Sequence, residues 1–147
     1  MTLAETLRDS EVSTTLFYGA RRASELFFVD EFARLGVRVV LSTEDGSRGV
    51  HGRVTAPLEA AFAKRSGEIH MYTCGPTPMM SAVARVAEAN GCPCDVSLEQ
   101  VMGCGLGGCY SCVVGVRDEN ERTHFVRSCI EGPVFDSRRV VWEALGD

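Results

Sequence analysis

The chain has 147 residues, enough for one or two compact domains with an apolar core. Hydrophobic residues make up 45% and charged residues 24%, with a net charge of −5, which argues against a nucleic-acid surface. No apolar run approaches the roughly 20 residues that a membrane helix needs.

The first two thirds of the sequence alternate strand and helix patterns. We expect strands at 14–18, 37–41, 68–73 and 95–98, and helices at 24–35, 58–64 and 76–90. A core stripe is expected on the last helix, made of Met79, Met80, Val83 and Val86. Strands that alternate with helices predict an α/β fold with a parallel, nucleotide-binding-like sheet.

The amino-acid composition of the sequence changes near Glu99. Glycine and cysteine dominate as far as Cys112, and short β-like runs follow at 113–116 and 123–127. We therefore expect two domains, an α/β domain at 1–98 and a small β-rich domain at 99–147. About fifty residues rarely fold on a hydrophobic core alone, and a metal centre would supply the missing stability.

Four of the seven cysteines have a specific spacing, Cys104-x4-Cys109-x2-Cys112, then sixteen intervening residues, then Cys129. Plant-type [2Fe–2S] proteins use C-x4-C-x2-C and a distant fourth cysteine. Glycines at 105, 107 and 108 let the backbone turn sharply and bring its N–H groups close to the sulfurs. The spacing predicts a [2Fe–2S] cluster on these four thiols.

Two alternatives stay open for these cysteines. Four-cysteine zinc sites usually consist of two short C-x2–4-C pairs, and the second pair is absent here. Disulfides fit poorly with an odd number of cysteines and with an amino-terminus that lacks a secretory signal pattern. The cytoplasm is the default location, and thiols stay reduced there.

Three separated motifs occur in a specific order: T-C-G-P-T-P-M-M at 73–80, V-S-L-E-Q-V-M-G-C-G-L-G-G-C-Y-S-C at 96–112 and C-I-E-G-P-V-F-D at 129–136. With F-Y-G-A-R-R at 17–22 and the stretch 42–55, they resemble the electron-transfer subunits of NAD-linked dihydroorotate dehydrogenases, in the ferredoxin reductase superfamily. The resemblance covers about Leu3 to Val141.

The resemblance implies a path of electrons between NAD(H), FAD, a [2Fe–2S] cluster and a flavin-containing catalytic subunit. Cys74 and Gly75 would lie near the nicotinamide. The dinucleotide pocket would be lined by Gly19, Arg21, Thr43, Glu44 and Asp45. The family works as a heteromer, so we expect a heteromer or a homodimer.

The chain departs from the family in two ways. It has no room for the FAD-binding β-barrel, and it lacks the glycine-rich strand and turn that cradles the pyrophosphate. We therefore expect a truncated sheet without its first strand. NAD(H) binding stays open, and FAD is expected on another chain that supplies the barrel.

Two hypotheses of function follow. The first is an electron-transfer module, a component of an NAD-linked oxidoreductase in pyrimidine biosynthesis rather than a complete enzyme; related sulfide, sulfite or ferredoxin reductases are near alternatives. The second is a non-catalytic, partner-binding fragment. No side chain is expected to be catalytic, because no nucleophile has a paired base.

Overall fold

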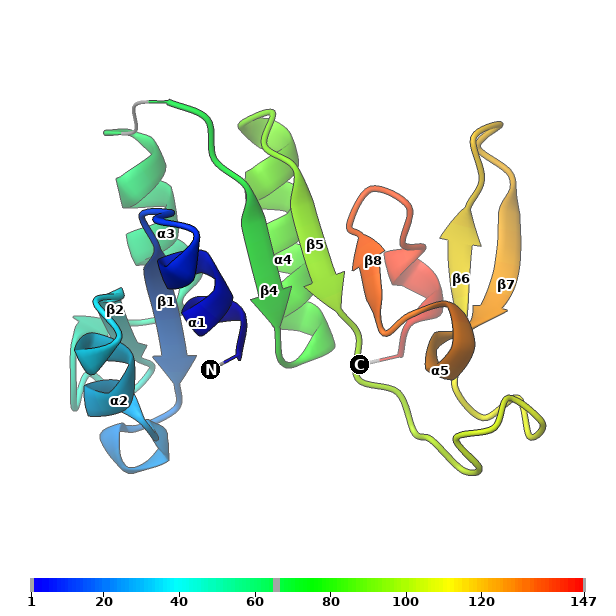
Figure 1. The fold of residues 1–147 in the computed structure, drawn as a ribbon, viewed down its shortest axis with the longest axis horizontal. Helices are drawn as coiled ribbons and strands as arrows, with labels where there is room; N and C mark the ends of the chain where they lie inside the picture. The colour runs from blue at the N-terminus through cyan, green and yellow to red at the C-terminus, as the bar shows by residue number, and fades with distance from the viewer. Residues whose placement is uncertain (1, 65–66, 147) are drawn as a thin grey trace. The chain divides into compact units, whose positions relative to one another are not determined.

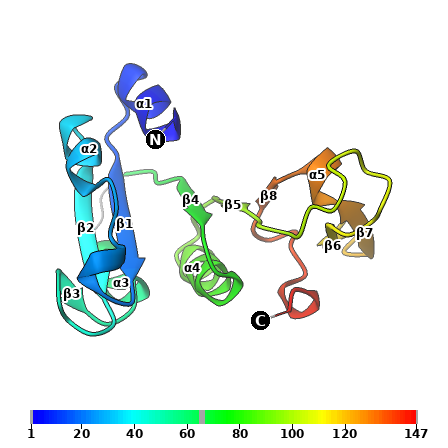
Figure 2. The same ribbon diagram turned by 90° about the horizontal axis from the view of Figure 1, so that it is seen from below.

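The computed structural model describes residues 2–64 and 67–146. The chain divides into two compact units at residues 65–66. Figure 1 shows the elements of each unit, and Figure 2 shows them from below. In the two described ranges, no helix has both the length and the apolar character needed to cross a membrane.

The first unit is built on a parallel sheet. Helix α1 (Thr2–Asp9) precedes strands β1 (Thr15–Ala20), β2 (Arg38–Thr43) and β3 (Val50–His51), which lie in the order β1-β2-β3. Both pairings are parallel. Two further helices, α2 (Val29–Arg34) and α3 (Thr55–Phe62), follow β1 and β3. The expected parallel α/β arrangement is therefore confirmed in this unit.

The continuous helix expected over 24–35 is wrong. The structure has a 3₁₀ turn, η1 (Ala23–Glu25), and a separate six-residue helix, α2. Phe28 lies between them in the left-handed region at φ 58°, a conformation that interrupts a right-handed helix.

A side chain from the sheet holds this interruption in place. The hydroxyl of Tyr18, on β1, donates to the carbonyl of Glu25 at 3.4 Å and accepts from the N–H of Phe27 at 3.2 Å. Both backbone groups would otherwise be available for helical hydrogen bonds. The pattern of apolar residues over 24–35 does not reveal a partner on the preceding strand.

The second unit contains a mixed sheet covered by a helix. Strands β4 (Met71–Cys74) and β5 (Cys94–Ser97) are parallel, and β8 (Val134–Asp136) pairs antiparallel with β5. Helix α4 (Thr77–Ala89) packs on β4 and β5. Its buried residues are Met80, Val83, Ala84, Val86 and Ala87. The expected stripe is thus confirmed except at Met79, which is only partly buried.

A hairpin and two short helical segments complete the second unit. Strands β6 (Val113–Arg117) and β7 (Thr123–Arg127) pair antiparallel, and α5 (Ser128–Glu131) follows directly. A 3₁₀ turn, η2 (Trp142–Ala144), lies near the carboxyl end of the chain. The hairpin core is small and aliphatic: Val114, Val116, Val126 and Val140 are all buried.

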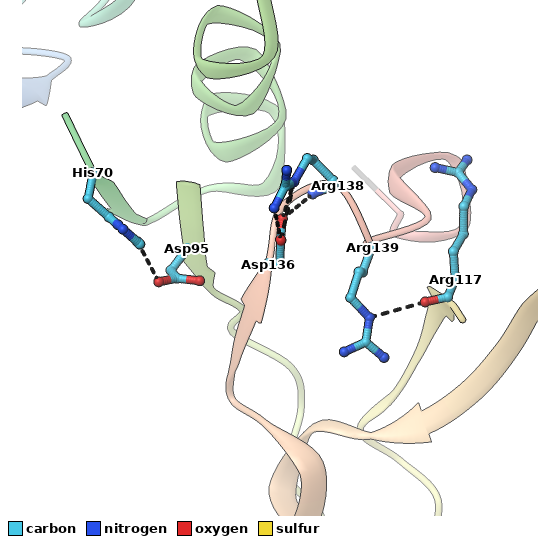
Figure 3. A network of polar contacts seen from close by, with 6 residues as sticks. All are labelled: His70, Asp95, Arg117, Asp136, Arg138 and Arg139. Carbon is cyan, nitrogen blue, oxygen red and sulfur yellow. Dashed lines mark hydrogen bonds and ion pairs between the residues drawn. The ribbon is translucent and has the colours of Figure 1, made fainter. Parts of the chain in front are cut away.

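Polar contacts accompany the strand pairings of the second unit, and Figure 3 shows three of them. His70 bonds Asp95 at 2.8 Å, and Arg138 holds the carboxylate of Asp136. The Nε of Arg139 donates to the carbonyl of Arg117 at 3.1 Å. The last contact joins the segment after β8 to the end of β6.

The boundary between the two compact units lies at residues 65–66, whereas the change in sequence composition predicts a boundary at residue 98. The reason lies in β8, which belongs to the cysteine-rich segment by sequence and to the sheet of β4 and β5 by hydrogen bonding. The domains at 1–98 and 99–147 stay a prediction.

The turn between β6 and β7 supplies a pH-dependent prediction. Oδ1 of Asp118 accepts the N–H groups of Asn120 at 2.8 Å and Arg122 at 2.9 Å. The Arg122 bond, followed by the Asn120 bond, holds the pKa of Asp118 below its usual value. The pKa of Asp118 is therefore lower in the folded than in the unfolded chain. The stability that these two bonds contribute is fully present above the unfolded pKa and is lost as the pH falls through the folded pKa.

We expect Asp118→Ala to lower the free energy of unfolding at pH 7, and we expect the difference from the parent chain to shrink below about pH 4. Urea unfolding at both pH values measures this. Glu119→Ala removes the same charge from the same turn and serves as the control. A difference that persists unchanged at the acidic pH would contradict the prediction.

Candidate metal centre

The loop between β5 and β6 carries three cysteines and folds back on itself. Three of its residues have left-handed backbone conformations: Gly105 at φ 63°, Gly107 at φ 80° and Tyr110 at φ 58°. Glycine adopts this conformation at little cost. These reversals place the loop beside α5, where the fourth cysteine lies (Figures 1 and 2).

Cys104 and Cys109 form the first thiol pair. The N–H of Leu106 donates to the Sγ of Cys104 at 3.4 Å. This bond, the N–H of Cys109, the Cys109 thiol and the N–H of Gly108 together lower the pKa of Cys104 to about 6. A thiolate is the form of cysteine that binds metals.

Cys112 and Cys129 form the second thiol pair. The N–H of Cys129, followed by its thiol, lowers the pKa of Cys112. The pKa of Cys129 is raised, first by its hydrogen bond with the Cys112 thiol and then by burial. A hydrogen bond therefore joins the two thiols. Cys112 precedes β6 and is only 3% exposed, so this pair lies at the inner side of the loop.

Backbone amides lie near three of the four sulfurs, those of Cys104, Cys112 and Cys129. Besides the three N–H groups at Cys104 and the two at Cys112, the N–H of Gly107 is directed at the thiol of Cys129. Amide donors offset negative charge on thiolates and on inorganic sulfide. This part of the sequence-based expectation, glycines that let N–H groups approach sulfur, agrees with the geometry.

The two thiol pairs fit a binuclear cluster. In a four-cysteine [2Fe–2S] centre each iron takes two protein sulfurs, and the two irons share two sulfides. In residues 2–64 and 67–146 no three His, Cys, Asp or Glu side chains lie close enough to hold a metal ion. The contacts between the thiols pair Cys104 with Cys109 and Cys112 with Cys129, and Cys104 and Cys109 are the exposed pair.

The sequence-based expectation does not include two residues at this site, Arg127 and Tyr110. The guanidinium of Arg127 donates to the carbonyl of Gly107 at 2.6 Å and lies 5.2 Å from the ring centre of Tyr110. The only indication in the sequence that Arg127 lies near the site is weak: it precedes Cys129 by two residues. Nothing in the spacing shows that its side chain returns to the glycine loop.

The five residues expected at a dinucleotide pocket lie where β1 and β2 end. Gly19 pairs with Ser42 in the parallel register, and Thr43 is the next residue of β2. The N–H of Glu44 bonds the carbonyl of Ala20 at 3.1 Å, and that of Asp45 bonds the carbonyl of Arg21 at 3.1 Å. The structure therefore brings these five residues together.

Several of these side chains also hold the first unit together. The buried hydroxyl of Thr43 donates to the carbonyl of Arg48 at 2.9 Å, and Asp45 accepts the N–H and hydroxyl of Ser47. The Ser47 bonds lower the pKa of Asp45. A Cβ on Gly19 would lie 2.9 Å from the Cβ of Val54. Packing thus gives these positions a structural role.

Cys74 and Gly75 lie in the second unit, at the carboxyl end of β4. The thiol of Cys74 donates to Oε1 of Glu99 at 3.7 Å, and its pKa is raised, first by burial and then by this carboxylate. Gly75 has φ 143°, and a Cβ there would lie 2.8 Å from the methyl group of Met79. The strand end is where ligands of open α/β sheets bind.

Comparisons with known proteins match both parts of the chain. Residues 2–85 match the family model "Oxidoreductase NAD-binding domain". Residues 99–141 match the model "Iron-sulfur cluster binding domain of dihydroorotate dehydrogenase B". The two matches together span nearly the whole sequence.

Curated relatives are electron transfer subunits of dihydroorotate dehydrogenase B (NAD(+)). The subunit of Desulforamulus reducens is 35% identical over 141 residues, which is 96% of this chain and 53% of that protein. That of Caldanaerobacter subterraneus is 39% identical over 119 residues, covering 80% and 46%. The chain spans about half the length of the curated relatives it matches.

A solved structure has a similar fold. It is a chain of the NADH-dependent reduced ferredoxin-NADP oxidoreductase, described for flavin-based electron bifurcation. The TM-score is 0.78 at 30% identity, over 96% of this chain and 49% of that one.

Proposed function

The chain belongs to the oxidoreductase NAD-binding domain family and carries an iron–sulfur cluster binding domain of the dihydroorotate dehydrogenase B type, and on that basis we propose that it is an electron-transfer module. It passes electrons through a [2Fe–2S] cluster between an NAD(H)- and FAD-dependent reductase unit and a flavin-containing partner. The partner is the catalytic subunit of a dihydroorotate dehydrogenase.

The observation that carries this proposal is the two-plus-two arrangement of thiols. The contacts between thiols pair Cys104 with Cys109 and Cys112 with Cys129, so the first pair would hold one iron and the second pair the other. When bound, such a cluster takes up and releases one electron at a time, and plant-type clusters have reduction potentials of about −400 mV. In this proposal, residues 99–147 form the domain that binds the cluster, and residues 1–98 form the nucleotide-binding-like domain.

The cysteine loop supplies the thiol ligands and the amide donors, and part of it is exposed to solvent. Cys104 and Cys109 are exposed, whereas Cys112 is buried, so one side of the site is open to a partner. Large apolar side chains are exposed on the same loop, among them Leu106 at 87% and Val101 at 77%. Exposed apolar patches commonly mark interaction sites. The proposal places the flavin-containing partner against this loop.

A related reductase is the second candidate. The ferredoxin-NADP oxidoreductase chain shares 30% identity and a TM-score of 0.78 with this chain. In that case the same cluster exchanges electrons with a ferredoxin instead of the catalytic subunit of a dihydroorotate dehydrogenase. Titrating the reduced chain with each isolated acceptor distinguishes the two candidates by the rate of cluster reoxidation.

The first test is an anaerobic purification followed by a visible spectrum before and after dithionite. We expect about two irons and two sulfides per chain, with charge-transfer bands that bleach on reduction. A colourless protein that carries zinc, or that takes up no iron and sulfide after anaerobic reconstitution, would overturn the proposal.

A further inference from the structure

Arg127 connects the hairpin to the cysteine loop. It is the last residue of β7 and pairs with Val113, at the end of the hairpin next to Cys112. Its Nη1 donates to the carbonyl oxygen of Gly107 at 2.6 Å, across twenty residues of sequence. The side chain is partly buried, so this charged hydrogen bond is shielded from solvent competition.

The same guanidinium makes a second contact with the loop. It lies 5.2 Å from the ring centre of Tyr110, within the range of a cation–π interaction. Gly107 and Tyr110 flank Cys109, and both have left-handed backbone conformations. A single side chain thus holds the loop on both sides of one thiol.

The hydrogen bond to Gly107 also orients a neighbouring amide. The carbonyl of Gly107 and the N–H of Gly108 belong to one planar peptide group and, in the usual trans form, point in opposite directions. The N–H of Gly108 is one of the donors directed at the sulfur of Cys104. Holding the carbonyl therefore also holds this N–H in place.

We propose that Arg127 is a positioning residue of the cluster: it fixes the Gly107–Gly108 peptide toward Cys104 and places a permanent positive charge beside the site. The inference rests on the proposed function. Reduction adds negative charge to the cluster, and both the amide donor and the guanidinium stabilise that charge. Arg127 therefore raises the reduction potential.

The test measures midpoint potentials of the reconstituted full chain by redox titration, followed by the visible bands and by the electron paramagnetic resonance of the reduced form. In Arg127→Met we expect the ratio of reduced to oxidised cluster, at the parent's midpoint potential, to fall about tenfold, which is about 59 mV for one electron. Arg127→Lys keeps the charge and one donor, so we expect an intermediate shift.

Arg122→Met is the matched control. Arg122 lies in the turn at the opposite end of the same hairpin, and it contributes its backbone N–H to Asp118. Its substitution removes an identical charge without touching the loop. We expect its potential to stay close to that of the parent chain.

The outcomes separate the two proposals. A parent chain that takes up no cluster defeats the proposed function itself. A parent chain that loads fully, with Arg127→Met at the same potential or shifted no further than Arg122→Met, overturns the role of Arg127. Loss of iron and sulfide from Arg127→Met alone, restored in Arg127→Lys, supports it, because charge and donor are what the lysine restores.

Discussion

Replacing Cys129 with alanine is expected to abolish assembly of the cluster. The thiols of Cys112 and Cys129 are in contact, and removal of one leaves an iron with a single protein sulfur. Anaerobic reconstitution of the variant should give iron and sulfide counts near zero and no visible charge-transfer bands.

The control is Cys92→Ala, which removes a thiol from the segment between α4 and β5. Cys92 is buried and lies outside the cysteine loop. Its variant should bind the same iron and sulfide as the parent chain. Unchanged loading in Cys129→Ala would contradict the assignment of the fourth ligand, and equal loss in both variants would point to a folding defect instead.

Replacing Gly49 with alanine is expected to lower the free energy of unfolding by about 2–5 kcal/mol. Gly49 has φ 74°, and left-handed backbone costs other residues roughly 1–2 kcal/mol. Its Cβ would lie 2.5 Å from the carbonyl carbon of Leu41, and nearer still to that carbonyl oxygen. Overpacking adds about 1–3 kcal/mol.

The Leu41 backbone cannot easily move away, because Leu41 pairs with Tyr18 in the parallel ladder of β1 and β2. Gly52→Ala is the matched control: Gly52 also has a positive φ, 118°, and a Cβ there meets no atom within 4 Å. Urea unfolding measures both variants. Equal losses in the two would show that only backbone strain matters at Gly49.

Local patterns were sufficient for much of the second unit. The apolar stripe of α4 has a helical period, and the buried residues of β5 alternate as a strand requires. The parallel pairs follow from strands that alternate with helices. The cysteine spacing predicts the cluster domain that the family model matches at residues 99–141.

The missed features depend on side chains that lie outside the segment in which each pattern is found. Tyr18 interrupts a helix that its apolar period favours, because its hydroxyl takes two backbone groups. Arg127 donates a hydrogen bond to Gly107, twenty residues earlier, and no local sequence pattern predicts that bond. Propensity and period describe one segment at a time, whereas these contacts arise only once the segments have packed.

The place of β8 in the sheet of β4 and β5 limits how modules can be exchanged between related reductases. Removing residues 99–147 as a block would take β8 away from β5 and break the pairing of Val96 with Phe135. The chain that remains would keep β5 with one unpaired side, and exposed strand edges template association between chains. The natural transplantable piece is therefore the loop with its hairpin, inserted between β5 and β8 so that both strands remain.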